Sequence, residues 1–199
     1  MTARPRNWKR RFELFTRFDR GIRFDKEGFE ISKTETVADF LAARLPGKVV
    51  LDAFTGLGGS AIAFARHGKR VISIEANRGR SQMAARNAAV YGVQRRIRFV
   101  VGDSLKLWRR FRFDTAYFDP PWAASRREQR KGLRFASFKP NVRPLIRTLL
   151  GAGKTCAVTV PQNFDLNELR AIRRHVELYF LHQYGRPYCI HCIWRADKR

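Results

Sequence analysis

Residues 48–59 read KVVLDAFTGLGG, and this stretch decides the fold class. The apolar run after Lys48 is typical of a buried strand, and the three glycines indicate a tight turn directly after it. Residues 60–66 then have the pattern of a helix. A strand that passes through a glycine-rich turn into a helix is the opening unit of an α/β fold with a parallel sheet.

The rest of the chain repeats this alternation of strand and helix. We predict strands at 71–75, 97–101, 113–119, 155–160, 176–184 and 188–194, and helices at 78–91, 140–150 and within 161–172. The fold class is therefore α/β: a doubly wound, mostly parallel, seven-stranded sheet of Rossmann-like type. The last two strands, joined by a short turn at Gly185, place one antiparallel strand at the edge.

The N-terminal segment departs from this alternation. We predict two domains: residues 1–33 form a small helical lobe, and residues 34–199 form the α/β domain. Aromatic residues at 8, 12, 15 and 18 have nearly helical spacing and predict a helix over 7–18. Gly28 predicts a turn in an extended piece that ends near Ser32, and Thr34 is the expected N-cap of the next helix.

Three carboxylates stand where predicted parallel strands end. Asp52, Glu75 and Asp103 end the first, second and third strands, and ligands of doubly wound folds bind outside these ends. Glu75 can accept both hydroxyls of a ribose, and Asp103 can accept from an adenine amine. The glycine turn matches neither the GxGxxG fingerprint nor a P-loop. This combination favours S-adenosylmethionine over NAD as the cofactor.

The fourth strand ends at residues 117–122, which read YFDPPW. Proline has no N–H for the strand ladder, so the strand stops and the chain is stiff where Asp119 and Trp122 emerge. Asp119 and the Pro120 carbonyl can accept hydrogen bonds from an exocyclic amine, while Trp122 stacks on its ring. The alternative is a strand end with a core tryptophan.

The charge of the chain indicates a polyanionic partner. It has 41 Lys and Arg against 17 Asp and Glu, a formal net charge of +24, and 31 of the basic residues are Arg. Guanidinium groups suit phosphate binding and base stacking, so we predict nucleic acid as the partner. An Arg-rich run, Arg126, Arg127 and Arg130, follows the YFDPPW stretch directly. It can contact phosphate or form a solvated loop.

Other features exclude classes of protein. Three cysteines make an odd count without disulfide spacing, and Cys189, His191 and Cys192 lack the paired C-x-x-C spacing of a zinc site. We predict no metal. No apolar run approaches the about 20 residues of a membrane span, and the N-terminus lacks a signal-peptide core. We therefore expect a cytoplasmic monomer.

The chain resembles the trimethylguanosine synthase family, which methylates N2 of the RNA cap guanine and has the class I methyltransferase fold. Asp-Pro-Pro-Trp is also similar to the motif of enzymes that methylate exocyclic amines of bases. The stretches that carry the family resemblance are 11–19, 21–22, 25–29, 52–59, 85–87, 91–92, 100–103, 120–122 and 161–165. They span nearly the whole chain.

This resemblance implies roles for individual residues. It implies that Phe15 lies over the cofactor and that Trp122 stacks on the guanine. The full predicted cofactor site is Phe15, Asp52, Phe54, Gly56, Gly58, Glu75, Ala76, Asp103, Ser104 and Asp119. The predicted catalytic residues are Asp119, Pro120 and Trp122, and the predicted substrate-binding residues are Trp122, Asn163, Arg126, Arg127 and Arg130.

The chain departs from the family pattern at three places. Asp119 replaces a serine before Pro-Pro-Trp, residues 123–125 read AAS in place of Gly-Gly-Pro, and Lys33 replaces a threonine near the cofactor. The predicted function is S-adenosylmethionine-dependent methylation of an exocyclic amine in RNA, and guanine N2 is the first choice of target. The alternatives are methylation of adenine N6 or cytosine N4, and a non-catalytic RNA-binding module on a methyltransferase fold.

Overall fold

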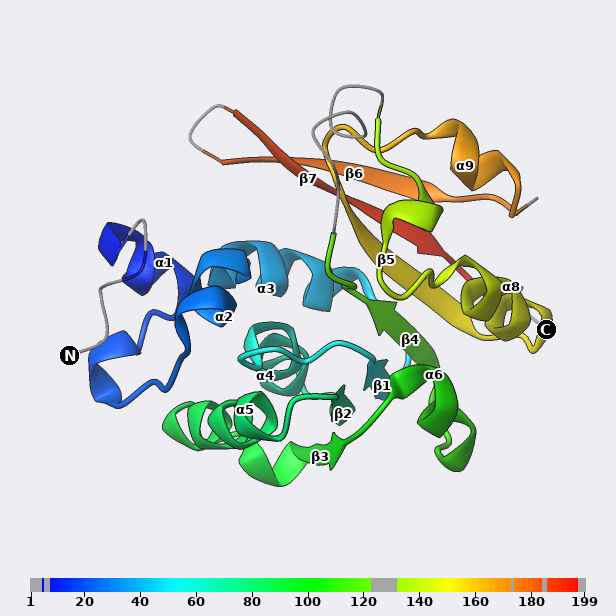
Figure 1. The fold of residues 1–199 in the computed structure, drawn as a ribbon. Helices are drawn as coiled ribbons and strands as arrows, with labels where there is room; N and C mark the ends of the chain where they lie inside the picture. Colours follow the sequence, from blue (N-terminus) through cyan, green and yellow to red (C-terminus); the bar gives the residue numbers. More distant parts are fainter. Residues whose placement is uncertain (1–4, 6–7, 123–131, 173, 184–185, 197–199) are drawn as a thin grey trace. The chain divides into compact units, whose positions relative to one another are not determined.

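The computed structural model of the chain describes residues 5, 8–122, 132–172, 174–183 and 186–196. They form two compact units, Met1–Asp114 and Thr115–Arg199, whose helices and strands are labelled in Figure 1. The strands belong to a seven-stranded sheet with the order β3-β2-β1-β4-β5-β7-β6. The sheet is mostly parallel, has helices on both sides and carries an antiparallel hairpin at one edge, which confirms the predicted fold class.

The first unit contains three parallel strands with helices between them. Val50 of β1 lies opposite Val71 of β2, and Val71 lies opposite Ile97 of β3. The elements in chain order are η1 (Trp8–Arg10), α1 (Arg11–Leu14), η2 (Phe18–Arg20), α2 (Lys26–Ile31), α3 (Glu35–Arg44), β1 (Val49–Asp52), α4 (Gly59–Arg66), β2 (Arg70–Glu75), α5 (Arg78–Val90), η3 (Gln94–Arg96), β3 (Ile97–Val101), α6 (Ser104–Leu107) and η4 (Trp108–Arg110).

The predicted single helix over 7–18 is confirmed only for residues 8–14, and the chain leaves the helix before Phe15. The chain forms the short helices η1 and α1 and then turns extended at Phe15, whose φ is −145°. Aromatic packing decides this path, because Trp8 stacks on Phe29 at 5.7 Å between ring centroids and meets Phe18 edge-on at 5.3 Å. One straight helix does not bring these side chains around a common centre, and folding the segment back does.

The extended piece predicted around Gly28 is also wrong, because Gly28 lies inside helix α2. The Asp25 carboxylate caps this helix and accepts a hydrogen bond from the Gly28 N–H at 2.6 Å. A Cβ placed on Gly28 would lie 3.0 Å from the Leu57 side chain. The glycine therefore marks a close approach of α2 to the glycine turn. Thr34 is the N-cap residue of α3, as predicted.

The second unit holds the other four strands, in the order β4-β5-β7-β6. β4 is parallel to β5, with Phe118 opposite Val158, and β7 is antiparallel to both β5 and β6. The elements are β4 (Thr115–Phe118), η5 (Phe135–Ser137), α8 (Arg143–Gly151), β5 (Thr155–Pro161), α9 (Asn167–Arg170), β6 (Glu177–Gln183) and β7 (Arg186–Trp194). All four residues of β4 are buried. In the described part of the chain, no helix is both long and apolar enough to cross a membrane.

Candidate active site

The turn after β1 depends on glycine at two positions. Gly56 and Gly58 have φ values of 55° and 90°, which side-chain-bearing residues rarely adopt. A Cβ on Gly58 would lie 3.0 Å from the Cβ and 3.2 Å from the Cα of Ala84 in α5. Gly58 thus provides both the left-handed conformation and the room for α5 to pack against the turn. Gly56 and Gly58, both predicted as cofactor residues, lie in the turn between β1 and α4.

Glu75 ends β2 and holds this turn in place. Its Oε2 accepts a hydrogen bond from the Gly56 N–H at 2.8 Å, and its Oε1 accepts one from the Asn77 N–H at 2.9 Å. Each carboxylate oxygen has two lone pairs, so both oxygens can still accept from a ligand hydroxyl. Glu75 was predicted as a ribose-binding residue. Its contact with the glycine turn is a second role that the sequence pattern does not reveal.

The other two acidic residues predicted to bind the cofactor, Asp52 and Asp103, lie at the ends of neighbouring strands. Asp52 ends β1 and is fully buried. Asp103 follows β3 and caps α6, because its Oδ1 accepts from the Leu105 N–H at 2.9 Å. β1, β2 and β3 are parallel, so their carboxyl ends share one edge of the sheet. Phe54 and Ala76 follow the ends of β1 and β2, and Ser104 follows Asp103.

Phe15 is buried and lies against Tyr91, at 6.4 Å between ring centroids. The Tyr91 hydroxyl donates to Glu35 Oε2 at 2.6 Å, and the Thr16 N–H donates to the same oxygen at 2.8 Å. Burial and the hydrogen bond to Glu35 raise the pKa of Tyr91 to about 12. Burial alone would raise the pKa of Glu35, but the hydrogen bonds from Tyr91 and Thr16 outweigh it and hold that pKa below its usual value.

Asn87 of α5 connects the N-terminal segment to the glycine turn. Its Nδ2 donates to the Arg23 and Leu57 carbonyls, both at 2.9 Å, and its Oδ1 accepts from the Arg23 N–H at 2.7 Å. The side chain is 0% exposed. One buried amide therefore fixes the backbone of two segments that are 34 positions apart in the sequence. No role was predicted for Asn87, and a polar residue on the buried face of α5 is the signal that could have found it.

A salt bridge supports the same attachment. Arg80 Nε donates to Asp25 Oδ2 at 2.8 Å, and this hydrogen bond is the main reason why the pKa of Asp25 lies below its usual value. Asp25 caps α2, so the ion pair joins α2 to the first turns of α5. Together with Asn87 and the Gly28–Leu57 contact, it sets the N-terminal segment directly on the glycine turn.

The second unit carries the YFDPPW corner. β4 ends at Phe118, Asp119 is half-buried, Pro120 is buried, and Trp122 keeps 40% of its surface exposed. Trp122 pairs with Phe138 in an isolated antiparallel bridge, and the Pro121 carbonyl accepts from the Lys139 N–H at 3.3 Å. The backbone of the corner is therefore anchored while the indole reaches solvent. This exposure excludes the core tryptophan and leaves a ring that can stack.

Buried hydrogen bonds brace the strand that leads to this corner. The Tyr117 and Thr159 hydroxyls lie 2.8 Å apart, and Thr159 Oγ1 lies 2.9 Å from His191 Nδ1. All three side chains are fully buried. They link β4, β5 and β7 across the second unit. His191, the histidine of the Cys189–Cys192 stretch, thus takes part in a structural network that sequence spacing did not indicate.

Asn163 follows β5 and contacts the chain downstream of the corner. Its carbonyl accepts from the Leu133 N–H at 2.9 Å, and the Leu133 carbonyl accepts from the Asp165 N–H at 2.8 Å. Leu133 and Phe164 form a parallel bridge. This places the predicted substrate residue Asn163 beside the segment that returns from the corner. Arg126, Arg127 and Arg130 lie outside the described residues.

Comparison with known proteins identifies a matching family model and two similar enzymes. The sequence model of the family described as RNA cap guanine-N2 methyltransferase matches residues 47–191. The chain is 29% identical over 180 residues to the trimethylguanosine synthase of Schizosaccharomyces pombe (strain 972). This alignment covers 85% of this chain and 75% of that protein. It is 27% identical over 207 residues to the trimethylguanosine synthase of Saccharomyces cerevisiae (strain S288c). This alignment covers 94% of this chain and 66% of that protein.

Solved structures confirm the fold. A protein from Porphyromonas gingivalis W83, to which a methyltransferase function is ascribed, has a TM-score of 0.73 at 22% identity and covers 88% of this chain and 43% of its own. TrmN from Thermus thermophilus has a TM-score of 0.59 at 23% identity, and the match covers 98% of this chain and 55% of TrmN. These identities support the fold alone. The family model covers well over half of the sequence, and the chain belongs to the RNA cap guanine-N2 methyltransferase family.

Proposed function

We propose that this chain transfers a methyl group from S-adenosylmethionine to the exocyclic N2 amine of a guanine in RNA. The observation that carries the proposal is the corner at the end of β4. A half-buried carboxylate and a stiff Pro-Pro step lead to an indole with 40% of its surface exposed, in a chain of this family. A flat base that stacks on Trp122 presents its edge amine to Asp119 and the Pro120 carbonyl.

The first unit has the features that S-adenosylmethionine needs. A Cβ placed on Gly56 would meet no atom within 4 Å, so the backbone of the glycine turn is open to a ligand there. Glu75 has acceptor capacity left for ribose hydroxyls after its two backbone contacts. Asp52 and Asp103 provide further carboxylates at the same edge. The residues present fit the cofactor, and bound S-adenosylmethionine supplies an electrophilic methyl group with a neutral thioether as leaving group.

The work of the corner residues is mainly positioning. A guanine N2 lone pair is delocalised into the ring, so the free amine is a weak nucleophile. Hydrogen bonds from its N–H groups to Asp119 and the Pro120 carbonyl favour a more tetrahedral nitrogen. Transfer requires the amine and the methyl group to be in line, about 3 Å apart, and alignment of this kind contributes more here than general-base catalysis. The nitrogen becomes cationic and acidic once the methyl group has been transferred, so the loss of its proton does not require a strong base.

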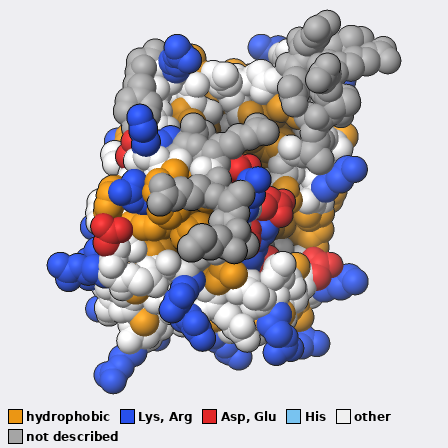
Figure 2. All heavy atoms as spheres, turned by 60° about the vertical axis from the view of Figure 1, so that its left-hand side comes forward, with side chains coloured by type: hydrophobic (Ala, Val, Ile, Leu, Met, Phe, Trp, Pro, Cys, Tyr) orange, Lys and Arg blue, Asp and Glu red, His pale blue; other side chains and the backbone are white. Residues whose placement is uncertain are grey.

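RNA as the substrate is supported by charge as well as by family. The excess of 24 positive charges is distributed widely, and Lys and Arg side chains are more frequent than Asp and Glu on the face drawn in Figure 2. Such a surface attracts the phosphate backbone without regard to sequence. A 7-methylated guanine is cationic, and stacking on Trp122 would add roughly 0.5–2 kcal/mol of cation–π attraction. We therefore place a capped 5′ end first among the RNA substrates.

Nucleoside mass spectrometry tests the proposal directly. The protein is incubated with isotopically labelled S-adenosylmethionine and capped or uncapped RNA, which is then digested to nucleosides. The expected product is guanosine labelled at N2, and Trp122→Ala should abolish it. Label in N6-methyladenosine or N4-methylcytidine would assign the corner to another base. If calorimetry shows that the cofactor binds but no nucleoside carries the label, the proposed methyl transfer is contradicted and an RNA-binding role is favoured.

A further inference from the structure

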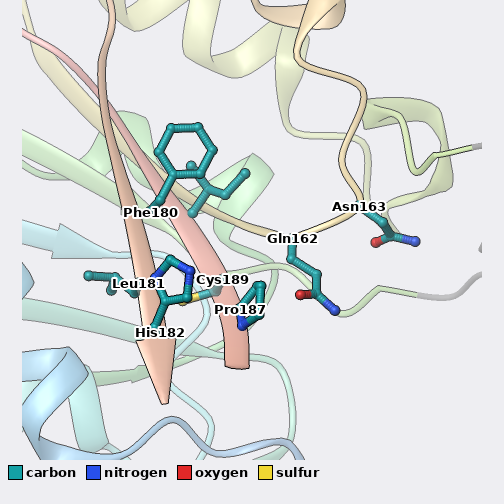
Figure 3. Close-up of a pocket in the computed structure, with 8 residues that line it drawn as sticks. Gln162, Asn163, Phe180, Leu181, His182, Pro187 and Cys189 are labelled. Carbon is teal, nitrogen blue, oxygen red and sulfur yellow. The ribbon is translucent and has the colours of Figure 1, made fainter. Parts of the chain in front are cut away.

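The second unit has a cavity, and of its lining residues only Asn163 has been given a role above. It has a volume of about 350 Å³ and lies between the chain leaving β5 and the β6–β7 hairpin (Figure 3). This volume lies within the roughly 300–1,000 Å³ typical of small-ligand sites. We call this cavity the Phe180 pocket. The residues that line it include Gln162, Asn163, Phe180, His182, Pro187 and Ile190.

The pocket presents an aromatic ring to solvent. Phe180 on the edge strand β6 is 57% exposed, although Phe is normally among the more buried residues. Ile190, directly opposite on β7, is buried and forms the apolar floor beside the ring. An exposed ring next to an apolar floor is suited to a flat partner that stacks on one side and covers carbon on the other.

The other side of the pocket is polar. Gln162 is exposed, and Figure 3 shows its amide near Pro187, across from the strand that carries Phe180 and His182. An amide both donates and accepts hydrogen bonds, which matches the mixed edge of a nucleobase better than a purely apolar ligand. Arg186, exposed at the start of β7, lies opposite Gln183 in the same hairpin and adds positive charge nearby. The chemistry is that of a base with its phosphate.

The pocket also lies on the correct edge of the sheet. β4 and β5 are parallel, with Phe118 opposite Val158, so Asp119 and Gln162 leave the same edge. Gln162 is four residues beyond Val158, and Asp119 is one beyond Phe118. This difference of three residues corresponds to about 10 Å along the strands. A strand of RNA whose base is held at the corner can therefore extend toward Phe180.

We propose that the Phe180 pocket binds a base of the RNA substrate that flanks the methylated guanine, by stacking on Phe180 and hydrogen bonding to Gln162. This inference rests on the proposed function and adds a second site of RNA recognition to it. It explains why the edge strand leaves a large apolar side chain exposed next to an amide. It also predicts that the protein prefers an oligonucleotide to a guanine mononucleotide with the same 5′ group.

Steady-state kinetics with two acceptors test this inference. Wild-type protein is compared with Phe180→Ala, using a 7-methylguanosine mononucleotide and a capped five-nucleotide RNA. Stacking contributes about 1–3 kcal/mol per base, which corresponds to an about 5- to 150-fold rise in KM for the capped RNA. The preference for RNA over mononucleotide should fall by the same factor. Phe180→Trp, which keeps a stacking face, should restore it.

Controls separate this role from a loss of structure. Ile31→Ala removes another exposed apolar side chain, 59% exposed in α2, and should leave the RNA preference unchanged. If Phe180→Ala does not fold, Gln162→Ala at the exposed rim should still raise the KM for RNA. A wild-type protein that methylates both acceptors equally, or variants with unchanged RNA preference, would overturn the pocket while the proposed function stands.

A binding measurement covers the case in which the proposed function itself fails. Fluorescence anisotropy of a labelled five-nucleotide RNA is measured with no methyl donor present. If no guanine is methylated but Phe180→Ala still weakens this RNA by about 5-fold or more, the pocket is an RNA site independent of the reaction. Equal affinity of the wild type and the variant would reject it.

Discussion

Replacing Asn87 with alanine tests whether one buried side chain couples the N-terminal segment to the glycine turn. The change removes three hydrogen bonds, a buried one to the Leu57 carbonyl and two partly buried ones to the Arg23 N–H and carbonyl. A lost bond costs roughly 0.5–1.5 kcal/mol net, and a buried group left unsatisfied costs roughly 1–3 kcal/mol. We expect a loss of about 3–5 kcal/mol, a large share of the roughly 5–15 kcal/mol typical of a domain.

Three assays report on different consequences of this change. Denaturant unfolding gives the free-energy loss. Calorimetry should show that S-adenosylmethionine binds about 10-fold or more weakly, because the Leu57 carbonyl belongs to the glycine turn. Limited trypsin digestion should cut faster after Arg23, whose backbone Asn87 holds on both sides. The matched control is Asn141→Ala in the second unit, which removes one local bond to the Arg143 N–H and should leave cofactor affinity unchanged.

The pattern of results decides the role of Asn87. A variant that is destabilised but binds the cofactor as tightly as the wild type, under conditions where both are folded, would show that Asn87 only supports the fold. A loss below about 0.5 kcal/mol, with no change in digestion at Arg23, would refute the reasoning altogether. It would mean that water or a neighbouring group replaces the amide without cost.

Three further predictions concern the corner, the N-terminal attachment and the charge. Trp122→Ala should abolish most methyl transfer while costing well under the roughly 3–5 kcal/mol of a buried tryptophan, as activity assays and melting curves would show. Glu35 has a lowered pKa when folded, so its stabilisation is present above its unfolded value of about 4.5 and is lost as the pH falls through the folded pKa. Tyr91→Phe removes a bond that lowers this pKa and should flatten the acid limb of a stability–pH curve. RNA affinity should fall log-linearly with salt, and a smaller slope is expected after neutralising three arginines together: Arg126, Arg127 and Arg130.

Much of the fold follows from local patterns in the sequence. The run before the glycine turn and the apolar segment at 155–160 appear as β1 and β5 within one or two residues of the prediction. These strands are buried in the sheet, so their apolar runs are continuous and easily detected. Residues 8–31 were harder, because Trp8, Phe18 and Phe29 pack around each other instead of lining one helix face. The spacing of apolar residues along the sequence indicates which of them share one helix face. It does not indicate that a segment folds back on itself.

The candidate site divides in the same way. The positions of Glu75, Asp103 and Asp119 in the fold could be predicted because each stands at or just after the end of a parallel strand, while their roles in the site stay predictions. Gly28 misled the prediction, since a glycine needed for close approach to Leu57 has the same sequence signature as a turn. For Trp122 the sequence left a core position open, and the exposure of the side chain excludes that position.

Asn87 and Phe180 mark the limit of local reasoning, and they do so for opposite reasons. Asn87 is a polar residue that is fully buried, and the groups it satisfies, on Arg23 and Leu57, are 64 and 30 residues away. Phe180 is an apolar residue that is exposed, and the pocket beside it needs Gln162 from another strand end. Each departs from the usual burial of its residue type, and such departures carry information because they cost stability unless a partner offsets them. For Asn87 the partner lies within the chain. For Phe180 no burial within the described chain offsets the exposure, and that is the reason to look for its partner in the RNA.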